Sequence, residues 1–151
     1  MIEWKCKSFE ALSVHELYYI LRLRAEVFVV EQNCAYQDAD NKDQKSYHFA
    51  GWDNNMPAAY VRLVPPGVSF TEPSIGRVVT SPAYRKSGLG RTLMQKAIDQ
   101  CLYIYGKQDI RIGAQLYLKK FYESLGFVQS SEMYLEDGIE HIEMLYNVNR
   151  D

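Results

Sequence analysis

Residues 76–92 read Gly76-Arg77-Val78-Val79-Thr80-Ser81-Pro82-Ala83-Tyr84-Arg85-Lys86-Ser87-Gly88-Leu89-Gly90-Arg91-Thr92, and this stretch is the most informative part of the sequence. Its β-branched residues predict a strand over 74–80, which Ser81-Pro82 ends. A polar loop over 84–90 then leads directly into a helix. The start of a helix exposes about four unpaired amides and roughly half a positive charge, so the stretch predicts a phosphate site.

The residue types within the loop favour the same interpretation. Gly88 and Gly90 allow a pyrophosphate to approach the backbone without meeting a Cβ atom. Arg85, Lys86 and Arg91 add positive charge at this one place. The loop is neither a Walker A sequence nor a complete G-x-G-x-x-G fingerprint, because Leu93 occupies the third glycine position.

The flanking segments predict one α/β domain over residues 1–151, with a mixed, mostly antiparallel sheet flanked by helices. We expect strands at 2–9, 47–52, 57–64, 74–80, 110–114, from 127 and at 140–148, and helices at 14–30, 89–105 and 116–125. Ser13 and Glu16 match a capping box before the first helix, and Gly106 is a typical stop after the second. Residues 136–138 predict a turn, and residues 31–45 a long polar loop.

Composition excludes several classes of protein. The 17 Lys and Arg against 19 Asp and Glu give a net charge of −2, which argues against binding nucleic acid through bulk charge. No apolar run approaches the roughly 18 residues of a membrane span, and residues 1–5 lack the layout of a secretory signal. Three scattered cysteines predict no disulfide framework, so we expect a reducing, cytoplasmic location.

No metal site is predicted. The histidines at 15, 48 and 141 have no zinc-ligand spacing. Asp38 and Asp40 begin like a calcium loop, but Lys42 stands where the third ligand belongs.

Two motifs together resemble the GNAT superfamily of N-acetyltransferases. Arg85-x-x-Gly88-x-Gly90, following Val78-x-Thr80-x-Pro82, closely resembles the acyl-CoA pyrophosphate loop of that superfamily. Residues 115–127, with a tyrosine on a short helix before Gly126-Phe127, resemble its second motif. Residues 23–43, 76–78 and 138–144 are similar to the ElaA-like branch, and the resemblance extends over about residues 2–148.

The resemblance implies a site for acetyl-CoA. Its members in this sequence are Val78, Val79, Thr80, Arg85, Lys86, Ser87, Gly88, Leu89, Gly90, Arg91, Gln115 and Tyr122. Amides over 86–91 would hold the pyrophosphate, and the backbone of 78–80 would pair with pantetheine like an added strand. Gln115 stands where many members carry an asparagine.

The resemblance also implies that Tyr122 is the general acid that protonates the departing thiolate, because a phenol keeps its proton at neutral pH. On spacing alone, Tyr122 is better explained as a core aromatic on the apolar face of its helix. His141 and Glu31 are two candidates for the general base, and a water relay is a third possibility. The carboxylates of Glu31, Asp38, Asp40 and Asp43 are expected either to attract a cationic amine or to form a solvated loop.

The function that follows is transfer of the acetyl group of acetyl-CoA to a small-molecule or peptide amine by direct attack in a ternary complex, without a metal, nucleic acid or membrane. A monomer and a homodimer are both compatible with the sequence. Two alternatives stay open, namely a non-catalytic sensor that binds acyl-CoA and an enzyme that transfers a longer acyl group. The sequence identifies neither the amine acceptor nor the base.

Overall fold

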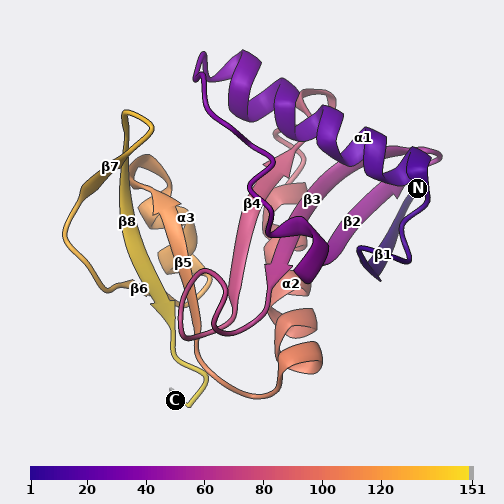
Figure 1. Ribbon diagram of the computed structural model, residues 1–151. Helices are drawn as coiled ribbons and strands as arrows, with labels where there is room; N and C mark the ends of the chain where they lie inside the picture. Colours follow the sequence, from indigo (N-terminus) through magenta and orange to yellow (C-terminus); the bar gives the residue numbers. More distant parts are fainter. Residues whose placement is uncertain (150–151) are drawn as a thin grey trace.

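Two antiparallel sheets lie side by side in the computed structural model, which describes residues 1–149 (Figure 1). The first sheet has the order β1-β2-β3-β4, with β1 at Ile2–Ser8, β2 at Tyr47–Asp53, β3 at Met56–Val64 and β4 at Ser74–Thr80. The second has the order β5-β8-β6, with β5 at Ile110–Gln115, β8 at Ile139–Tyr146 and β6 at Phe127–Gln129, and β7 at Tyr134–Glu136 also pairs with β8. The predicted fold class is confirmed, with the sheet divided between β4 and β5.

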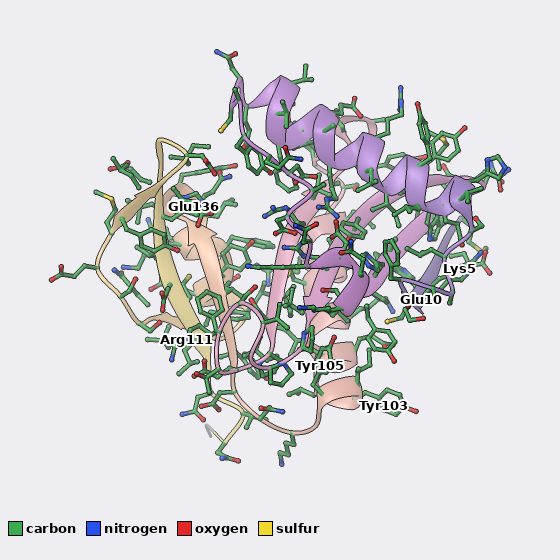
Figure 2. All side chains as sticks on the ribbon, in the orientation of Figure 1. Lys5, Glu10, Tyr103, Tyr105, Arg111 and Glu136 are labelled. Carbon is green, nitrogen blue, oxygen red and sulfur yellow. The ribbon has the colours of Figure 1, made fainter. Side chains whose placement is uncertain are left out.

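The two sheets meet at one end and separate at the other. Strands β4 and β5 point the same way and spread apart toward their carboxyl ends (Figure 1). At their amino ends, the amide of Arg111 donates to the carbonyl oxygen of Pro73 at 3.1 Å. Figure 2 labels Arg111 at this joined end and Glu136 at the open end. The resulting V opens at the ends of β4 and β5, where the sequence places its candidate site residues.

Helix α1, at Val14–Arg24, begins at the predicted capping box. The amide of Glu16 donates to Ser13 Oγ at 3.0 Å, and the amide of Ser13 donates to Glu16 Oε1 at 2.8 Å. The expectation of one α-helix to residue 30 is wrong, because the helix widens into a π-helix over Ala25–Glu31. Three valines in this segment disfavour regular α-helix packing at χ1, and π-turns of this kind often occur at functional sites.

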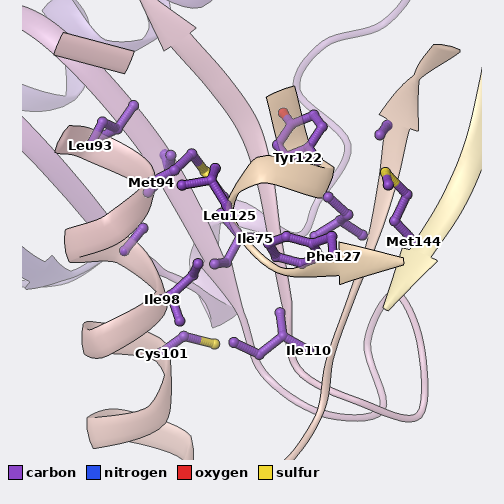
Figure 3. Packing of buried hydrophobic residues seen from close by; sticks show 14 of the residues in the cluster. Ile75, Leu93, Met94, Ile98, Cys101, Ile110, Tyr122, Leu125, Phe127 and Met144 are labelled. Atoms are coloured by element: carbon purple, nitrogen blue, oxygen red, sulfur yellow. The ribbon is translucent and has the colours of Figure 1, made fainter. Parts of the chain in front are cut away.

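Helix α2, at Leu89–Tyr105, covers the opposite face of the first sheet from α1. Its predicted apolar face is buried and contains Leu93, Met94, Ala97, Ile98 and Cys101. These residues pack with Val61 of β3 and with Phe127 in the main core (Figure 3). Tyr60, the neighbour of Val61, packs on α1 instead, since successive side chains of a strand point to opposite faces.

The carboxyl-terminal part differs from prediction in detail. The helix expected over 116–125 is a 3-10 turn at Leu116–Leu118 followed by α3 at Lys119–Ser124. Strand β7 was not predicted, because its central residue Leu135 is exposed and gives no burial pattern. Strand β7 pairs with β8, and the two are connected by a turn at Asp137 and Gly138. The φ angles of these residues, 50° and 79°, are those of a tight hairpin turn. Within residues 1–149, no helix is long and apolar enough to cross a membrane.

Candidate active site

A cavity of about 640 Å³ occupies the space between the separated ends of β4 and β5. It is lined by Val27, Phe28, Glu31, Gln32, Cys34, Tyr36, Ile75, Gly76, Arg77, Val78, Val79, Thr80, Arg85, Gly90, Ile112, Gly113, Gln115, Tyr117, Leu118, Phe121, Tyr122, Glu136, Asp137, Ile139 and His141. The sequence-predicted residues in this lining are Glu31, Val78, Val79, Thr80, Arg85, Gly90, Gln115, Tyr122 and His141. The other predicted residues, Lys86, Ser87, Gly88, Leu89 and Arg91, lie next to Arg85 or Gly90 in the chain but not in the lining.

Strand β4 is an edge of its sheet and carries a bulge. Arg62 pairs with Gly76 and Tyr60 with Val79, so two residues of β4 lie opposite the single residue Val61. The first of the two, Arg77, has a φ of +51°, which is rare for a residue with a side chain. An edge strand leaves backbone donors and acceptors free on its outer side, and here that side faces the cavity. An extended amide-containing chain fits such an edge as an added strand.

The start of α2 has the features of a phosphate site. Gly88 precedes the helix with a φ of +77°, and a Cβ atom added there would meet nothing within 4 Å. The first helical hydrogen bond runs from the amide of Thr92 to the Gly88 carbonyl at 3.2 Å. The amides of residues 89–91 therefore lack helical acceptors and suit an anion.

Two of the basic side chains near this helix start are held by other residues. Arg85 donates to both carboxylate oxygens of Glu31, at 2.6 and 2.5 Å, and so joins the loop to the π-helix. The hydrogen bonds from Arg85 lower the pKa of Glu31. Arg91 donates to Ser124 Oγ at 2.6 Å and lies over the ring of Phe121. A carboxylate that an arginine stabilises in this way is a weaker proton acceptor.

Tyr122 projects from α3 and is 5% exposed. Its ring packs edge-on against Phe121 and Phe127, with centroids 5.2 and 5.9 Å away. Its hydroxyl oxygen points away from the apolar cluster (Figure 3), and no hydrogen-bond partner for it occurs among residues 1–149. Burial raises the pKa of the phenol. The expectation of a core aromatic is therefore confirmed, and the side chain also lines the cavity. The role of Tyr122 as general acid stays a prediction.

His141 lies on β8, opposite Gln115 of β5 and Tyr134 of β7. Its Nδ1 atom is 2.8 Å from the carbonyl oxygen of Ile139, and its Nε2 atom is 3.7 Å from Glu136 Oε2. The ring stacks on Tyr134 and is largely buried. The imidazole is thus held in one orientation at the open end of the cleft, next to a carboxylate.

Two contacts connect the segment after the π-helix to the second sheet. The side-chain amides of Gln32 and Gln115 exchange hydrogen bonds at 3.3 and 3.5 Å. The thiol of Cys34 donates to the carbonyl oxygen of Asp137 at 3.6 Å. Gln32 and Cys34 therefore bound the cavity on this side, and the side-chain oxygen and nitrogen of Gln115 already have partners.

Neither expectation for the acidic loop is correct for Asp38, Asp40 and Asp43. Their carboxylates are paired with three arginines, Arg24, Arg62 and Arg77, in a largely buried network. Burial by itself raises the pKa of Asp40, but the hydrogen bonds from Arg62 outweigh it and bring the value to about 2. Because each of these carboxylates is paired with at least one arginine, none is free to attract an amine. The sequence did not reveal this pairing, since Arg62 and Arg77 lie far from the aspartates in the chain.

Sequence reasoning also missed several residues of the cavity. Phe28, Gln32, Tyr36, Arg77 and Glu136 all line it. The bulge that turns Arg77 into this position has no sequence signature, and β7 brings Glu136 to the cleft without a burial pattern.

Among the described residues 1–149, no group of three His, Cys, Asp or Glu side chains is arranged to hold a metal ion.

Comparison with known proteins identifies the family to which this fold and cavity belong. Residues 14–148 match the family described as Acetyltransferase (GNAT) domain. The protein ElaA of Escherichia coli is 42% identical over 150 residues, which cover 98% of both chains. The crystal structure of that ElaA superposes with a TM-score of 0.91 and covers 97% of this chain and 100% of its own at 41% identity. An acyl-CoA N-acyltransferase from Pseudomonas aeruginosa superposes with a TM-score of 0.92, covering 96% and 99% of the two chains at 40% identity.

Proposed function

The chain belongs to the GNAT acyltransferase family, in its ElaA-like branch, and we propose that it transfers the acetyl group of acetyl-CoA to the nitrogen of an amine. One observation carries the proposal. A single cavity is lined by the free edge of β4, by Gly90 at the start of α2 and by the buried side chain of Tyr122. We assign these three to pantetheine, to pyrophosphate and to proton donation, which together are what reaction of a CoA thioester requires.

The donor would bind along one line of the cleft. The amides of residues 89–91 and the positive end of α2 suit the pyrophosphate, and Gly88 leaves room for it. The edge of residues 78–80 suits the two amides of the pantetheine arm. A backbone amide of this edge would also stabilise the negative charge that develops on the thioester oxygen.

The proposal assigns acid and base to opposite sides of the thioester. Tyr122, whose pKa burial raises, keeps its proton at neutral pH and donates it to the sulfur as the carbon–sulfur bond breaks. His141 accepts the proton that the amine nitrogen loses as the carbon–nitrogen bond forms. Glu136, close to Nε2 of His141, then stabilises the positive imidazolium. The products are an amide and the free thiol of CoA.

A short acyl group fits the inner end of the cavity. Ile75 of β4 and Ile112 of β5 line it there, near the joined ends of the strands, and both are 2% exposed. We infer that the acyl group lies against these two apolar side chains. An apolar inner end is compatible with acetyl as the transferred group, and we propose acetyl on that basis. The three cysteines are free thiols, which supports a reducing location such as the cytoplasm.

The proposal is tested by measuring release of the CoA thiol together with the mass of the acylated product. Acetyl-CoA and octanoyl-CoA are each offered with spermidine, lysine, or a peptide with a free amino terminus. We expect transfer to at least one amine, with acetyl-CoA faster than octanoyl-CoA. Tight binding of acetyl-CoA without release of thiol for any amine would identify a sensor instead, and faster use of octanoyl-CoA would reject the acetyl assignment.

A further inference from the structure

Arg77 combines an unusual backbone with an unusual set of partners. It is the bulge residue of β4, with a φ of +51°, and it lies directly before the edge of residues 78–80. A residue with a Cβ atom disfavours this conformation, so the surrounding structure must hold it there. The partners of its side chain show how this is done.

The guanidinium of Arg77 holds two aspartates and covers an aromatic ring. Its Nε atom lies 2.8 Å from Asp38 Oδ1, and one terminal nitrogen donates to the carbonyl oxygen of Asp38 at 3.0 Å. The same nitrogen donates to Asp40 Oδ2 at 3.3 Å. The guanidinium carbon lies 5.6 Å from the ring centroid of Tyr36. The hydroxyl of Tyr36 donates back to Asp38 at 2.9 Å, so these four side chains form one connected group.

The two aspartates are themselves fixed to the core. Arg24, which is fully buried, donates to Asp38 at 2.9 Å. Arg62 of β3, which is 3% exposed, donates to both oxygens of Asp40 at 2.7 and 2.9 Å. Asp43 accepts from both of these arginines and closes the network. The charges of the three arginines and three aspartates cancel, and Arg77 is the one of these arginines that lines the cavity.

We propose that Arg77 is a positioning residue for acyl transfer, because its bonds to Asp38 and Asp40 keep the β4 bulge in the shape that directs the edge of residues 78–80 into the cleft. The inference rests on the proposed function, since the edge it positions is the one that contacts the thioester. Loss of these bonds releases the bulge toward ordinary strand geometry and turns the amides of residues 78–80 away from the developing charge. The phosphate site at α2 is separate from the network and keeps its shape.

The chain offers a matched control for this proposal. Arg111 is as exposed as Arg77, with side-chain values of 23% and 20%, and it also binds two carboxylates, Glu72 and Glu143. It lies at the joined end of the cleft, away from the bulge (Figure 2). Arg111→Gln therefore removes a comparable set of ion pairs without touching the edge of residues 78–80.

The test compares Arg77→Gly, Arg77→Lys and Arg111→Gln with the wild type, using acetyl-CoA and spermidine as probes. Glycine adopts a positive φ freely, so Arg77→Gly removes the bonds without adding backbone strain. We expect kcat to fall by about tenfold or more, because contacts to the transition state are lost. KM for acetyl-CoA should rise by less, about threefold, because pairing with pantetheine weakens while the phosphate contacts are kept. Lysine cannot hold both aspartates, so Arg77→Lys should fall between Arg77→Gly and the wild type. Arg111→Gln should keep the wild-type kcat.

Amide hydrogen exchange supplies a measurement that does not need activity. Exchange of the amides over 78–80 should be about tenfold faster in Arg77→Gly and unchanged in Arg111→Gln. A wild-type kcat in Arg77→Gly, or unchanged exchange over 78–80, would overturn the positioning role. A wild type that turns over no amine would instead reject the proposed function, and the exchange result would still decide whether Arg77 holds the bulge.

Discussion

The Nδ1 atom of His141 lies 2.8 Å from the carbonyl oxygen of Ile139, two residues earlier in β8. A carbonyl oxygen only accepts hydrogen bonds, so Nδ1 carries the proton of the neutral ring. The lone pair is then on Nε2, 3.7 Å from the carboxylate of Glu136 at the open end of the cleft. The backbone thus fixes the tautomer that a general base needs.

Replacing His141 should remove this base. We expect His141→Gln to lower kcat by about 10²-fold or more, the usual contribution of general base catalysis, with little change in KM for acetyl-CoA. Steady-state kinetics at saturating amine measures both constants. His15→Gln, at an exposed position on α1, is the control. If His141→Gln keeps kcat and Glu31→Gln loses it, then Glu31 is the base.

Gly88 and Gly67 give a matched pair for the phosphate site. Both have a positive φ, +77° and +84°, and an added Cβ atom would meet nothing within 4 Å at either. Alanine at either position should therefore lower the free energy of unfolding by a similar amount, about 1–2 kcal/mol. Only Gly88 precedes α2, so only Gly88→Ala should raise KM for acetyl-CoA, by about tenfold. Equal KM values for the two variants would place the pyrophosphate elsewhere.

The pairing of Asp40 with Arg62 predicts a pH-dependent stability. The pKa of Asp40 falls from 3.8 to about 2 in the folded protein, so the folded state favours the charged form. This contribution is complete above about pH 4 and is lost as the pH falls toward 2. Asp40→Asn should lower the free energy of unfolding by roughly 2 kcal/mol at pH 7, and the difference from the wild type should shrink below pH 4.

Urea unfolding of both proteins at several pH values measures that difference. Asp99→Asn, on the exposed face of α2, should show no comparable loss at any pH. A deficit of Asp40→Asn that stays constant from pH 7 to pH 3 would contradict the assignment of the shift to the ion pair.

The sequence was most informative where local chemistry determines the structure. The capping box at Ser13 and the apolar face and glycine stop of α2 depend on neighbouring residues, and these predictions are confirmed. The partners of Asp38 and Asp40 were not predictable, because Arg62 and Arg77 come from strands far along the chain. For the same reason, a local pattern revealed the phosphate loop but not the bulge at Arg77 in β4, which precedes that loop in the chain.

The separation of the two sheets is another feature that the sequence did not predict. The hydrogen bond from the Arg111 amide to the Pro73 carbonyl oxygen joins the amino ends of β4 and β5, and these residues are far apart in the sequence. No residue pattern specifies that β4 and β5 join at one end only. The motifs predicted which residues surround the site, but the positions of these residues relative to one another are seen only in the folded structure.

Tyr122→Phe in an acetyl-transfer assay tests the central proposal most directly. The substitution keeps the ring packed against Phe121 and Phe127 and removes only a hydroxyl without a partner among residues 1–149, so stability should change little. We predict that the wild type forms one acetylated amine per CoA thiol released, and that Tyr122→Phe lowers kcat by about 10²-fold or more. Tyr103→Phe, at an exposed position on α2, should match the wild type. Equal kcat values for Tyr122→Phe and the wild type would show that Tyr122 is not the general acid.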